Sequence, residues 1–403
     1  MGLLRDGHRA LLRSGRLLKD EIESARPVAW SPVPGVWTSS LKRPPDRRST
    51  TAQPAWRADQ ADFGPMTSLP TLEVTPRDLS AYRQGNTGID YVHRFESGRP
   101  GPHVLINALT HGNEICGMVA ATHLLDSGVR PLIGTLTVSF AHVEAYNSFN
   151  PERPFDSRQL VHNLNRIWSD DWLDSAEHSP ELKRARELRP AVAAADHILD
   201  IHSTSQPVSP FWVYPAFERN AAVASAIPLP AVHLVMPGLL GSSTPLIRHG
   251  RHGQAGSDAG AALVVECGQH FAQSSAALAT RVALDFLAHF GLMAPAPAAS
   301  GPEVADRRFE LLETHMVRTR QFAFVRPLIG FETFAKGERV ATDGDQGDIV
   351  APCDDCTIFM PTREPIIGRE AVYLTRPLRD CRAARTASGF AVKAVGRGRA
   401  VKP

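Results

Sequence analysis

One stretch decides the fold prediction: Val104-Leu-Ile-Asn-Ala-Leu-Thr-His-Gly-Asn-Glu-Ile-Cys-Gly-Met-Val-Ala-Ala121. Its apolar start predicts a buried strand that breaks at Thr110, and apolar residues at helical spacing then predict a helix to about Leu125. His111 and Glu114 are three residues apart at this junction, so one side of the turn can hold both side chains. An imidazole and a carboxylate at the carboxyl end of a strand suit a zinc ion in an α/β enzyme. Read alone, the pattern is equally typical of a surface histidine and a helix N-terminal glutamate that stabilises the helix dipole.

Strands and helices alternate through most of the chain. Strands are predicted over 89–95, 104–109, 135–141, 197–201, 211–214, 232–236 and 262–266, and helices over 180–194 and 272–290 in addition to the one that ends at about Leu125. This alternation predicts an α/β fold with a mixed, mostly parallel sheet flanked by helices on both faces, in a catalytic domain over 66–293. Residues 294–304 read as a linker by their Ala/Pro content, and short strands between Gly/Asp-rich turns then predict a small all-β domain over 305–378.

The two ends differ in composition from the middle. Residues 1–65 are rich in Arg, Pro and Ser and predict a disordered basic extension, and residues 379–403 predict a loose basic tail. The first 60 residues contain 11 Lys/Arg and 6 Asp/Glu, and the last 25 contain 7 and 1. Because the whole chain has a net charge of only +2, its middle is acidic, which argues against nucleic acid as a partner.

The sequence also restricts the compartment. No apolar run approaches the ~20 residues of a membrane span, and the N-terminus lacks the apolar segment of a secretory signal. Five cysteines without framework spacing favour a reducing, cytoplasmic setting. Cys353 and Cys356 form a CxxC, which is found in redox motifs and zinc sites but is more typical here of a plain turn in a hairpin. A homo-oligomer is compatible with the sequence.

His202 is the candidate for a third ligand, because it closes an apolar strand. With His111 and Glu114 it gives a two-histidine, one-glutamate set that leaves one zinc position open. Asp200 would point to the same side of the strand as His202 and could orient its ring. A histidine in this place is also typical of a core residue whose nitrogens are satisfied.

Glu266 and the segment from Arg158 to Arg166 could supply the remaining chemistry. Burying a carboxylate at the end of a strand costs free energy unless the carboxylate is paired with another group or takes part in a reaction. Near a zinc-activated water, Glu266 would serve as general base. It could also cap the following turn. Arg158 and Arg166 offer planar forks for a carboxylate or an oxyanion, and Asn165 adds a donor. Without context, the segment reads as a solvated loop.

Four motifs occur together in a fixed order: His111-Gly-Asn-Glu114, Asn163-Leu-Asn-Arg166, Asp200-Ile-His202 and Val265-Glu266-Cys-Gly. In order and approximate spacing they resemble the succinylglutamate desuccinylase/aspartoacylase family, which belongs to the zinc carboxypeptidase-like superfamily. The resemblance covers about residues 85–375. Four motifs in order are far more specific than any one of them.

The resemblance implies one zinc ion per chain, bound by His111, Glu114 and His202 with water as the fourth ligand. Glu266 corresponds to the family's catalytic glutamate, and Arg158 to the arginine that polarises the scissile carbonyl. The implied reaction is hydrolysis of the amide bond of a small N-acyl amino acid or related compound.

The same resemblance matches Asn165 and Arg166 to the pair that binds the substrate's carboxylate. The chain departs from the family at Asn163, where members often have Asp. It also lacks a recognisable equivalent of the further arginine and tyrosine that grip the acyl carboxylate in aspartoacylases, so the acyl group is not assigned. The β domain is similar to lipoyl/biotinyl-like hairpins and is predicted to act as a lid.

Two other functions are compatible with these residues. A metallocarboxypeptidase acting on peptides would share the metal and the Asn-Arg pair, although a capping β domain would narrow the pocket to small substrates. A zinc-dependent binding protein with a decayed site would need neither Glu266 nor Arg158. The leading prediction is therefore a zinc-dependent amidohydrolase.

Overall fold

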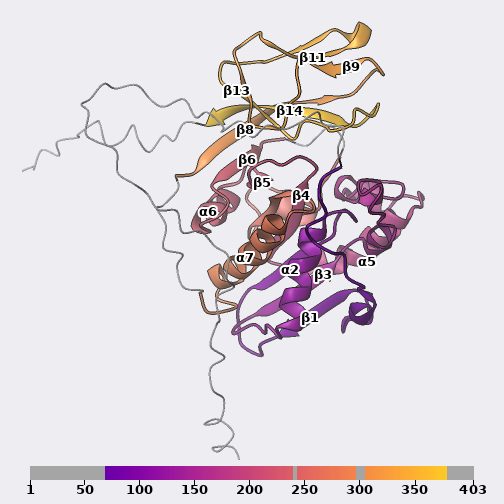
Figure 1. Cartoon of the computed structure of the whole chain (residues 1–403). Helices are drawn as coiled ribbons and strands as arrows, with labels where there is room; N and C mark the ends of the chain where they lie inside the picture. The colour runs from indigo at the N-terminus through magenta and orange to yellow at the C-terminus, as the bar shows by residue number, and fades with distance from the viewer. Residues whose placement is uncertain (1–68, 239–242, 296–304, 379–403) are drawn as a thin grey trace, which may run out of the picture. The chain divides into compact units, whose positions relative to one another are not determined.

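The computed structural model describes residues 69–238, 243–295 and 305–378, all within one compact unit (Figure 1). The predictions for 1–65 and 379–403, and most of the predicted linker, lie outside these residues. The strands that frame the site are β1 (Val92–Glu96), β2 (His103–Ala108), β3 (Thr135–Phe140), β4 (His197–Thr204), β5 (Phe211–Pro215), β6 (Val232–Met236) and β7 (Ala262–Gln269). The later strands are β8 (Arg307–Met316), β9 (Phe322–Phe324), β10 (Thr333–Phe334), β11 (Arg339–Asp343), β12 (Asp348–Val350), β13 (Cys356–Phe359) and β14 (Glu370–Leu378).

Eleven of these strands form one sheet in the order β1-β3-β2-β4-β7-β5-β6-β8-β14-β13-β10. Strands β3, β2, β4 and β7 are parallel neighbours, β5 is antiparallel to β7, and β6 and β8 continue parallel to β5. The predicted α/β fold with a mixed, mostly parallel sheet is confirmed. Because β2, β4 and β7 are parallel, their carboxyl ends meet at one edge of the sheet.

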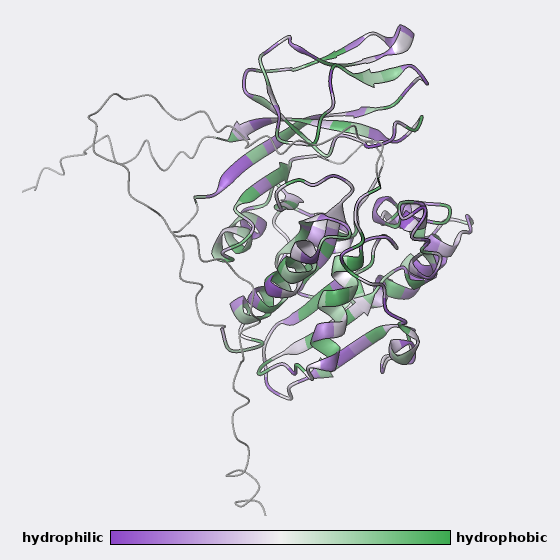
Figure 2. Ribbon diagram, viewed as in Figure 1, coloured by the Kyte–Doolittle hydropathy of each residue, from purple (hydrophilic) through white to green (hydrophobic). Residues whose placement is uncertain are grey.

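Helices cover both faces of this sheet, as the alternation of elements predicts. Helices α2 (Ile115–Asp126), α6 (Glu218–Ala226) and α7 (Gln273–His289) contribute to one core, and α4 (Asp170–Leu173) and α5 (Pro180–Ala194) to the other. In β2, Ile106 packs in the first core and Leu105 in the second, which is the two-residue alternation of a strand buried on both sides. Figure 2 shows α2 as one of the most hydrophobic elements, as its place over the central strands requires.

The strands after residue 305 extend the central sheet. Strand β8 pairs in parallel with β6, and β14, β13 and β10 follow as antiparallel neighbours, while β9, β11 and β12 form a separate three-stranded sheet (Figure 1). The sequence predicts most of these strands but not β10 and β14, and it also misses α4 and α6. The domain boundaries at 294–304 stay a prediction.

The CxxC segment is a turn, but the predicted hairpin around it is wrong. Strand β12 pairs with β11, whereas β13 pairs with β10 and β14, so the turn before Cys356 links two sheets. Both Cys353 and Cys356 are free thiols. Among the described residues, no helix is both long and apolar enough to cross a membrane.

Candidate metal centre

The turn after β2 brings three parts of the chain together. Leu109 is fully buried with φ of 57°, a left-handed conformation that a bulky residue keeps only where its surroundings impose it. At Gly112 a Cβ atom would lie 2.4 Å from both the Ser157 carbonyl oxygen and the Tyr146 backbone nitrogen. Only glycine permits this approach, and the Gly112 N–H donates to the Arg158 carbonyl at 3.2 Å. The turn therefore presents His111 while holding the Arg158 segment against it.

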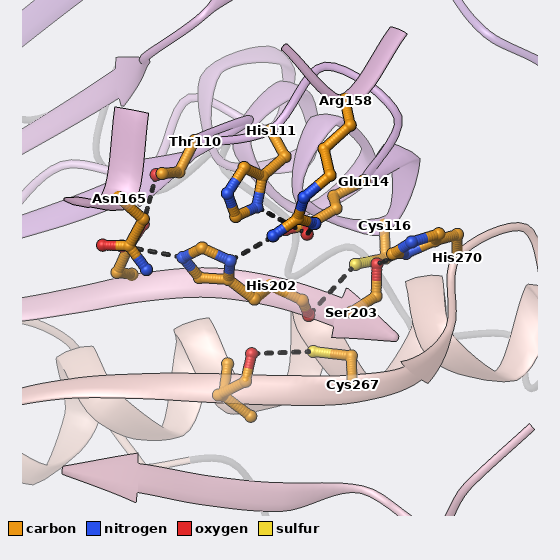
Figure 3. Close-up of polar contacts among 12 residues, drawn as sticks. Thr110, His111, Glu114, Cys116, Arg158, Asn165, His202, Ser203, Cys267 and His270 are labelled. Carbon is orange, nitrogen blue, oxygen red and sulfur yellow. Dashed lines mark hydrogen bonds and ion pairs between the residues drawn. The ribbon is translucent and has the colours of Figure 1, made fainter. Parts of the chain in front are cut away.

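His111, Glu114 and His202 form one buried group at this edge of the sheet (Figure 3). His111 Nδ1 lies 2.7 Å from Glu114 Oε1, and His202 Nδ1 lies 2.9 Å from Glu114 Oε2. The candidate ligand atoms of the three residues all lie within 4.8 Å of one another. His111 is buried, so the alternative of a surface histidine is wrong, and Glu114 at the N-cap of α2 forms no side-chain cap hydrogen bond with the described residues. The group could hold a metal ion.

The other nitrogen of each ring is held by an oxygen atom. His202 Nε2 lies 2.8 Å from Asp200 Oδ2, as the two-residue spacing predicts, and His111 Nε2 lies 2.9 Å from Asn163 Oδ1. A neutral imidazole whose Nε2–H donates outward keeps the lone pair of Nδ1 for a metal. The donor set of two imidazoles and a carboxylate is the one found in catalytic zinc sites, so these residues fit the metal that the motifs imply.

Asp200 is itself fixed by two neutral donors. The Asn107 side-chain amide and the Thr110 hydroxyl both donate to Asp200 Oδ1 at 2.8 Å. Asn107 lies opposite Asp200 in the register of β2 with β4, so the sheet itself sets this contact. The Asp200 carboxylate therefore keeps a fixed position behind His202.

Burial and neighbouring charges shift the pKa values of all three residues. Burial lowers the pKa of His111 to about 4, and Arg158 adds to the effect, so this ring is neutral at pH 7. Burial opposes the charge on Glu114, yet His111 and His202 hold the pKa of that carboxyl well below its usual range. Burial also opposes protonation of His202, but Asp200 and Glu114 raise its pKa well above the ordinary value. The two carboxylates thus favour a positive charge between them.

Glu266 lies beside the group on the neighbouring strand. It is directly opposite His202 in the parallel register of β4 with β7, so both side chains leave the same face of the sheet. Glu266 is 8% exposed, and its Oε2 has no hydrogen-bond partner in the described part of the chain. Burial raises the pKa of Glu266 to about 8, with Glu114 and Asp200 adding to the rise against His202 and Arg158. The alternative of a turn-capping carboxylate has no contact to support it.

Arg158 reaches the same group from a 3₁₀ turn. Its Nη1 donates to Glu114 Oε1 at 3.3 Å, and its side chain is 34% exposed (Figure 3). The residues that follow Arg158 are held by the buried Glu181 carboxylate, which accepts the N–H groups of Leu160 and Val161. Glu181 also contacts His142 Nε2 at 2.9 Å. The alternative of a solvated loop is therefore wrong for Arg158, because its guanidinium contacts Glu114 of the candidate metal centre.

Asn165 and Arg166 are also held in place by tertiary contacts. Asn165 Oδ1 accepts the Leu246 N–H at 3.0 Å, which commits this oxygen to the backbone. Arg166 is 20% exposed and forms an ion pair with Glu370, at 2.8 Å between Nε and Oε1. Asn163 accepts the Asn165 N–H and contacts His111, so the Asn163–Arg166 segment and the metal group are connected.

Several residues near the centre were missed from sequence. Glu370 and Tyr373 come from the unpredicted strand β14, and Ser203 and His270 form a buried pair with 2.8 Å between Oγ and Nδ1 (Figure 3). The β-branched and aromatic run after Ala371 was a usable signal for the strand. Nothing in the local sequence indicates that this strand contacts Arg166.

A buried two-histidine, one-glutamate group with a second glutamate and an arginine at its edge is suited to metal-dependent hydrolysis. Residues 100–245 match the family model of the succinylglutamate desuccinylase/aspartoacylase catalytic domain. The predicted resemblance is thereby confirmed over these residues. The match includes His111, Glu114 and His202 and ends before Glu266.

Solved structures share the fold. Succinylglutamate desuccinylase from Vibrio cholerae is similar at 19% identity and a TM-score of 0.54, over 72% of this chain and 86% of that chain. Succinylglutamate desuccinylase/aspartoacylase from Rhodobacter sphaeroides is similar at 19% identity and a TM-score of 0.51, over 70% and 87%. The product-bound ectoine utilization protein EutE (DoeB) from Ruegeria pomeroyi is similar at 16% identity and a TM-score of 0.51, over 72% and 88%. No curated protein matches the chain.

Proposed function

We propose that the protein is a zinc-dependent hydrolase that cleaves the amide bond of a small N-acyl amino acid or related compound. The observation that supports this proposal best is the position of Glu266, a buried carboxylate in register with His202, one oxygen of which has no partner among the described residues. A glutamate placed in this way is suited to proton transfer at a metal site, and a simple metal binder has no use for it. The family match supports a deacylase.

His111, Glu114 and His202 would hold one zinc ion per chain. When bound, zinc supplies Lewis-acid chemistry, because it lowers the pKa of a water molecule and polarises a carbonyl group. The Nδ1 atoms of both histidines already face Glu114, and Asp200 and Asn163 hold the opposite nitrogens. The chain therefore offers this group with its rings already oriented, which lowers the cost of assembling the site.

Glu266 would act first as base and then as acid. Its carboxylate accepts a proton from the attacking water and later gives that proton to the leaving amine, so the amide bond breaks to a carboxylic acid and an amine. Burial raises the pKa of Glu266 towards neutral pH, where a group that both accepts and donates a proton is most effective. Arg158 would stabilise the negative charge that develops on the carbonyl oxygen, and Asn165 and Arg166 would bind the other half of the substrate.

The decisive experiment compares Glu266→Gln with the wild type and with Glu152→Gln, a control at an exposed turn. Purified proteins are analysed for zinc and screened against N-acetyl- and N-succinyl-amino acids and short peptides. We expect about one zinc per chain in all three proteins, and a loss of turnover of about 10³-fold or more in Glu266→Gln alone.

Three outcomes would contradict the proposal. Unchanged hydrolysis in Glu266→Gln would exclude the role of this carboxylate. Cleavage of peptides in place of N-acyl amino acids would favour the metallocarboxypeptidase. Absence of bound metal in the wild type would remove the basis of the mechanism. A cytoplasmic location remains part of the proposal.

A further inference from the structure

The guanidinium of Arg158 depends on its backbone for its position. Among the described residues its side chain has one polar partner, Glu114, at 3.3 Å, and it is 34% exposed (Figure 3). Holding a long side chain costs rotamer entropy, which one contact offsets only in part, so its position follows largely from where its backbone is held. The Arg158 carbonyl accepts the Gly112 N–H at 3.2 Å, which fixes the backbone on one side. The residues that follow Arg158 fix it on the other.

The buried carboxylate of Glu181 holds these following residues. Its Oε1 accepts the N–H groups of Leu160 at 2.7 Å and Val161 at 3.1 Å. The side chains of Leu160 and Val161 are 40% and 57% exposed, so their own burial holds this segment only weakly. Burial opposes the charge on Glu181, yet His142 and the backbone N–H groups lower the pKa of its carboxyl. The segment is therefore held through its backbone by a charged, buried group.

His142 connects Glu181 to the turn that carries His111. Its Nε2 lies 2.9 Å from Glu181 Oε1, and its backbone N–H donates to the Leu109 carbonyl at 2.9 Å. Leu109 is the buried residue with the left-handed conformation just before that turn. Directly or through His142, Glu181 thus contacts both the turn after β2 and the residues after Arg158.

A role in capping α5 does not account for these contacts. Glu181 lies in the first turn of α5, where a carboxylate is favourable to the helix dipole. The cap itself is supplied by Ser179, whose Oγ accepts the Leu182 N–H at 3.0 Å. The hydrogen bonds of the Glu181 carboxylate instead go to His142 and to the backbone that follows Arg158, both outside α5.

Building on the proposed function, we infer that Glu181, oriented by His142, is a positioning residue that fixes the backbone around Arg158 for the reaction. The guanidinium is then in place for the carbonyl oxygen on which negative charge develops. Stabilising such a charge requires donors that are already positioned, and a misplacement of about 1 Å can cost about 10²-fold in rate. Glu181 itself is fully buried, so it acts through Arg158 without contacting the substrate.

The test is a double-mutant cycle in the full-length, zinc-loaded protein. The variants are Glu181→Ala, Arg158→Ala and the two combined. Glu187→Ala is the matched control, because Glu187 is also on α5 and forms an ion pair with Arg184 at 3.1 Å. We expect kcat to fall about 10²–10³-fold in Arg158→Ala and about 10²-fold in Glu181→Ala, with KM nearly unchanged in the latter. The combined variant should lose no more than Arg158→Ala alone, and Glu187→Ala should keep the wild-type kcat.

Thermal unfolding shows whether each variant is folded at the assay temperature. If Glu181→Ala is not, Glu181→Gln takes its place in the cycle, because it keeps one oxygen for the N–H groups but loses the charge. Its expected loss in kcat is about tenfold, the difference between a charged and a neutral acceptor. Additive losses in the combined variant, an effect on KM alone, or wild-type turnover in the Glu181 variant would overturn the inference.

A binding measurement decides the inference without turnover. Methylphosphonate is a tetrahedral anion that resembles the state formed by attack on an acetyl carbonyl, and it is titrated by calorimetry into the same zinc-loaded proteins. Binding weakened about tenfold in both single variants, with no further loss in the combined one, supports the inference. Equal binding by Glu181→Ala and the wild type, additive losses, or no binding by the wild type overturns it. If no N-acyl compound is hydrolysed, the proposed function fails, whereas the titration still decides the role of Glu181.

Discussion

Two buried clusters of histidine and carboxylate in this chain differ in how their oxygens are used. In the C-terminal strands, Asp343 Oδ1 accepts from the Thr319 N–H and hydroxyl, and Oδ2 contacts His315 Nε2 and accepts from the Arg318 N–H. At the candidate metal centre, the oxygens of Glu114 face ring nitrogens, and the neighbouring Glu266 Oε2 has no hydrogen-bond partner within the described ranges. A carboxylate with four donors is a structural anchor, whereas one with an oxygen that has no donor retains capacity for a metal or a proton.

The comparison also explains why sequence spacing alone is ambiguous. Asp200 and His202 are two residues apart on one strand, while His315 and Asp343 are 28 residues apart on two strands. Both pairs are buried, with 2.8 and 2.9 Å between the atoms in contact. The distance within a histidine–carboxylate pair therefore does not distinguish a candidate metal site from a structural cluster. The groups that surround each pair distinguish them.

The largest expected difference follows from removing the histidine of each cluster. His202→Ala should lose bound zinc and, with it, about 10³-fold or more of turnover, because a ligand of a three-ligand site is gone. His315→Ala should keep zinc and turnover at temperatures where it is folded, and lose stability instead. Metal analysis, kinetics and thermal unfolding of both variants measure this contrast. Equal zinc content in the two variants would show that the clusters do not differ as described.

A smaller effect is expected from the residue behind His202. Asp200→Asn keeps the size of the side chain but removes the charge that orients and activates the ring, so zinc affinity should fall about 10–100-fold. Competition with a chelator measures this change, and Asp306→Asn, at a partly exposed carboxylate that contacts Ser225, serves as the control. If Asp200→Asn binds zinc as tightly as the wild type, Asp200 contributes only to packing.

The smallest effect is a pH-dependent loss of stability at the structural cluster. Burial opposes the charge on Asp343, but His315, Arg318 and Thr319 together lower the pKa of its carboxyl to about 2. A lowered pKa means that this stabilisation is complete above about pH 4, near the unfolded value, and is lost as the pH falls toward about 2. Asp343→Asn should therefore cost about 2 kcal/mol at pH 7 and much less at pH 2.5.

Denaturant unfolding of the wild type and Asp343→Asn across this pH range measures the difference directly. Only the difference between the two proteins is used, because other carboxyl groups titrate in both. A constant difference between pH 7 and pH 2.5 would exclude the charge of Asp343 as the source of the stability.

Local patterns were sufficient for most of the strands and for the candidate ligands. The apolar run before Thr110 and the apolar segment after it predict β2 and α2 closely, because a strand and a helix that are buried on both sides consist almost entirely of apolar residues. Since parallel strands end at one edge, His111, His202 and Glu266 could be expected to meet once each was placed at a strand end. The alternatives at each residue could not be excluded from sequence, because they depend on which donors surround it.

The sequence by itself determined the order of motifs, the α/β fold and a group of residues suited to a metal. The tertiary structure alone decided the surroundings of that group, above all the contact of Arg166 with Glu370 across 204 residues of chain. That contact depends on the pairing of β14 with β8 and on a bulge within it. Local propensity acts over a few neighbouring residues, whereas strand register and bulges follow from packing of the whole sheet, so no nearby residue encodes them.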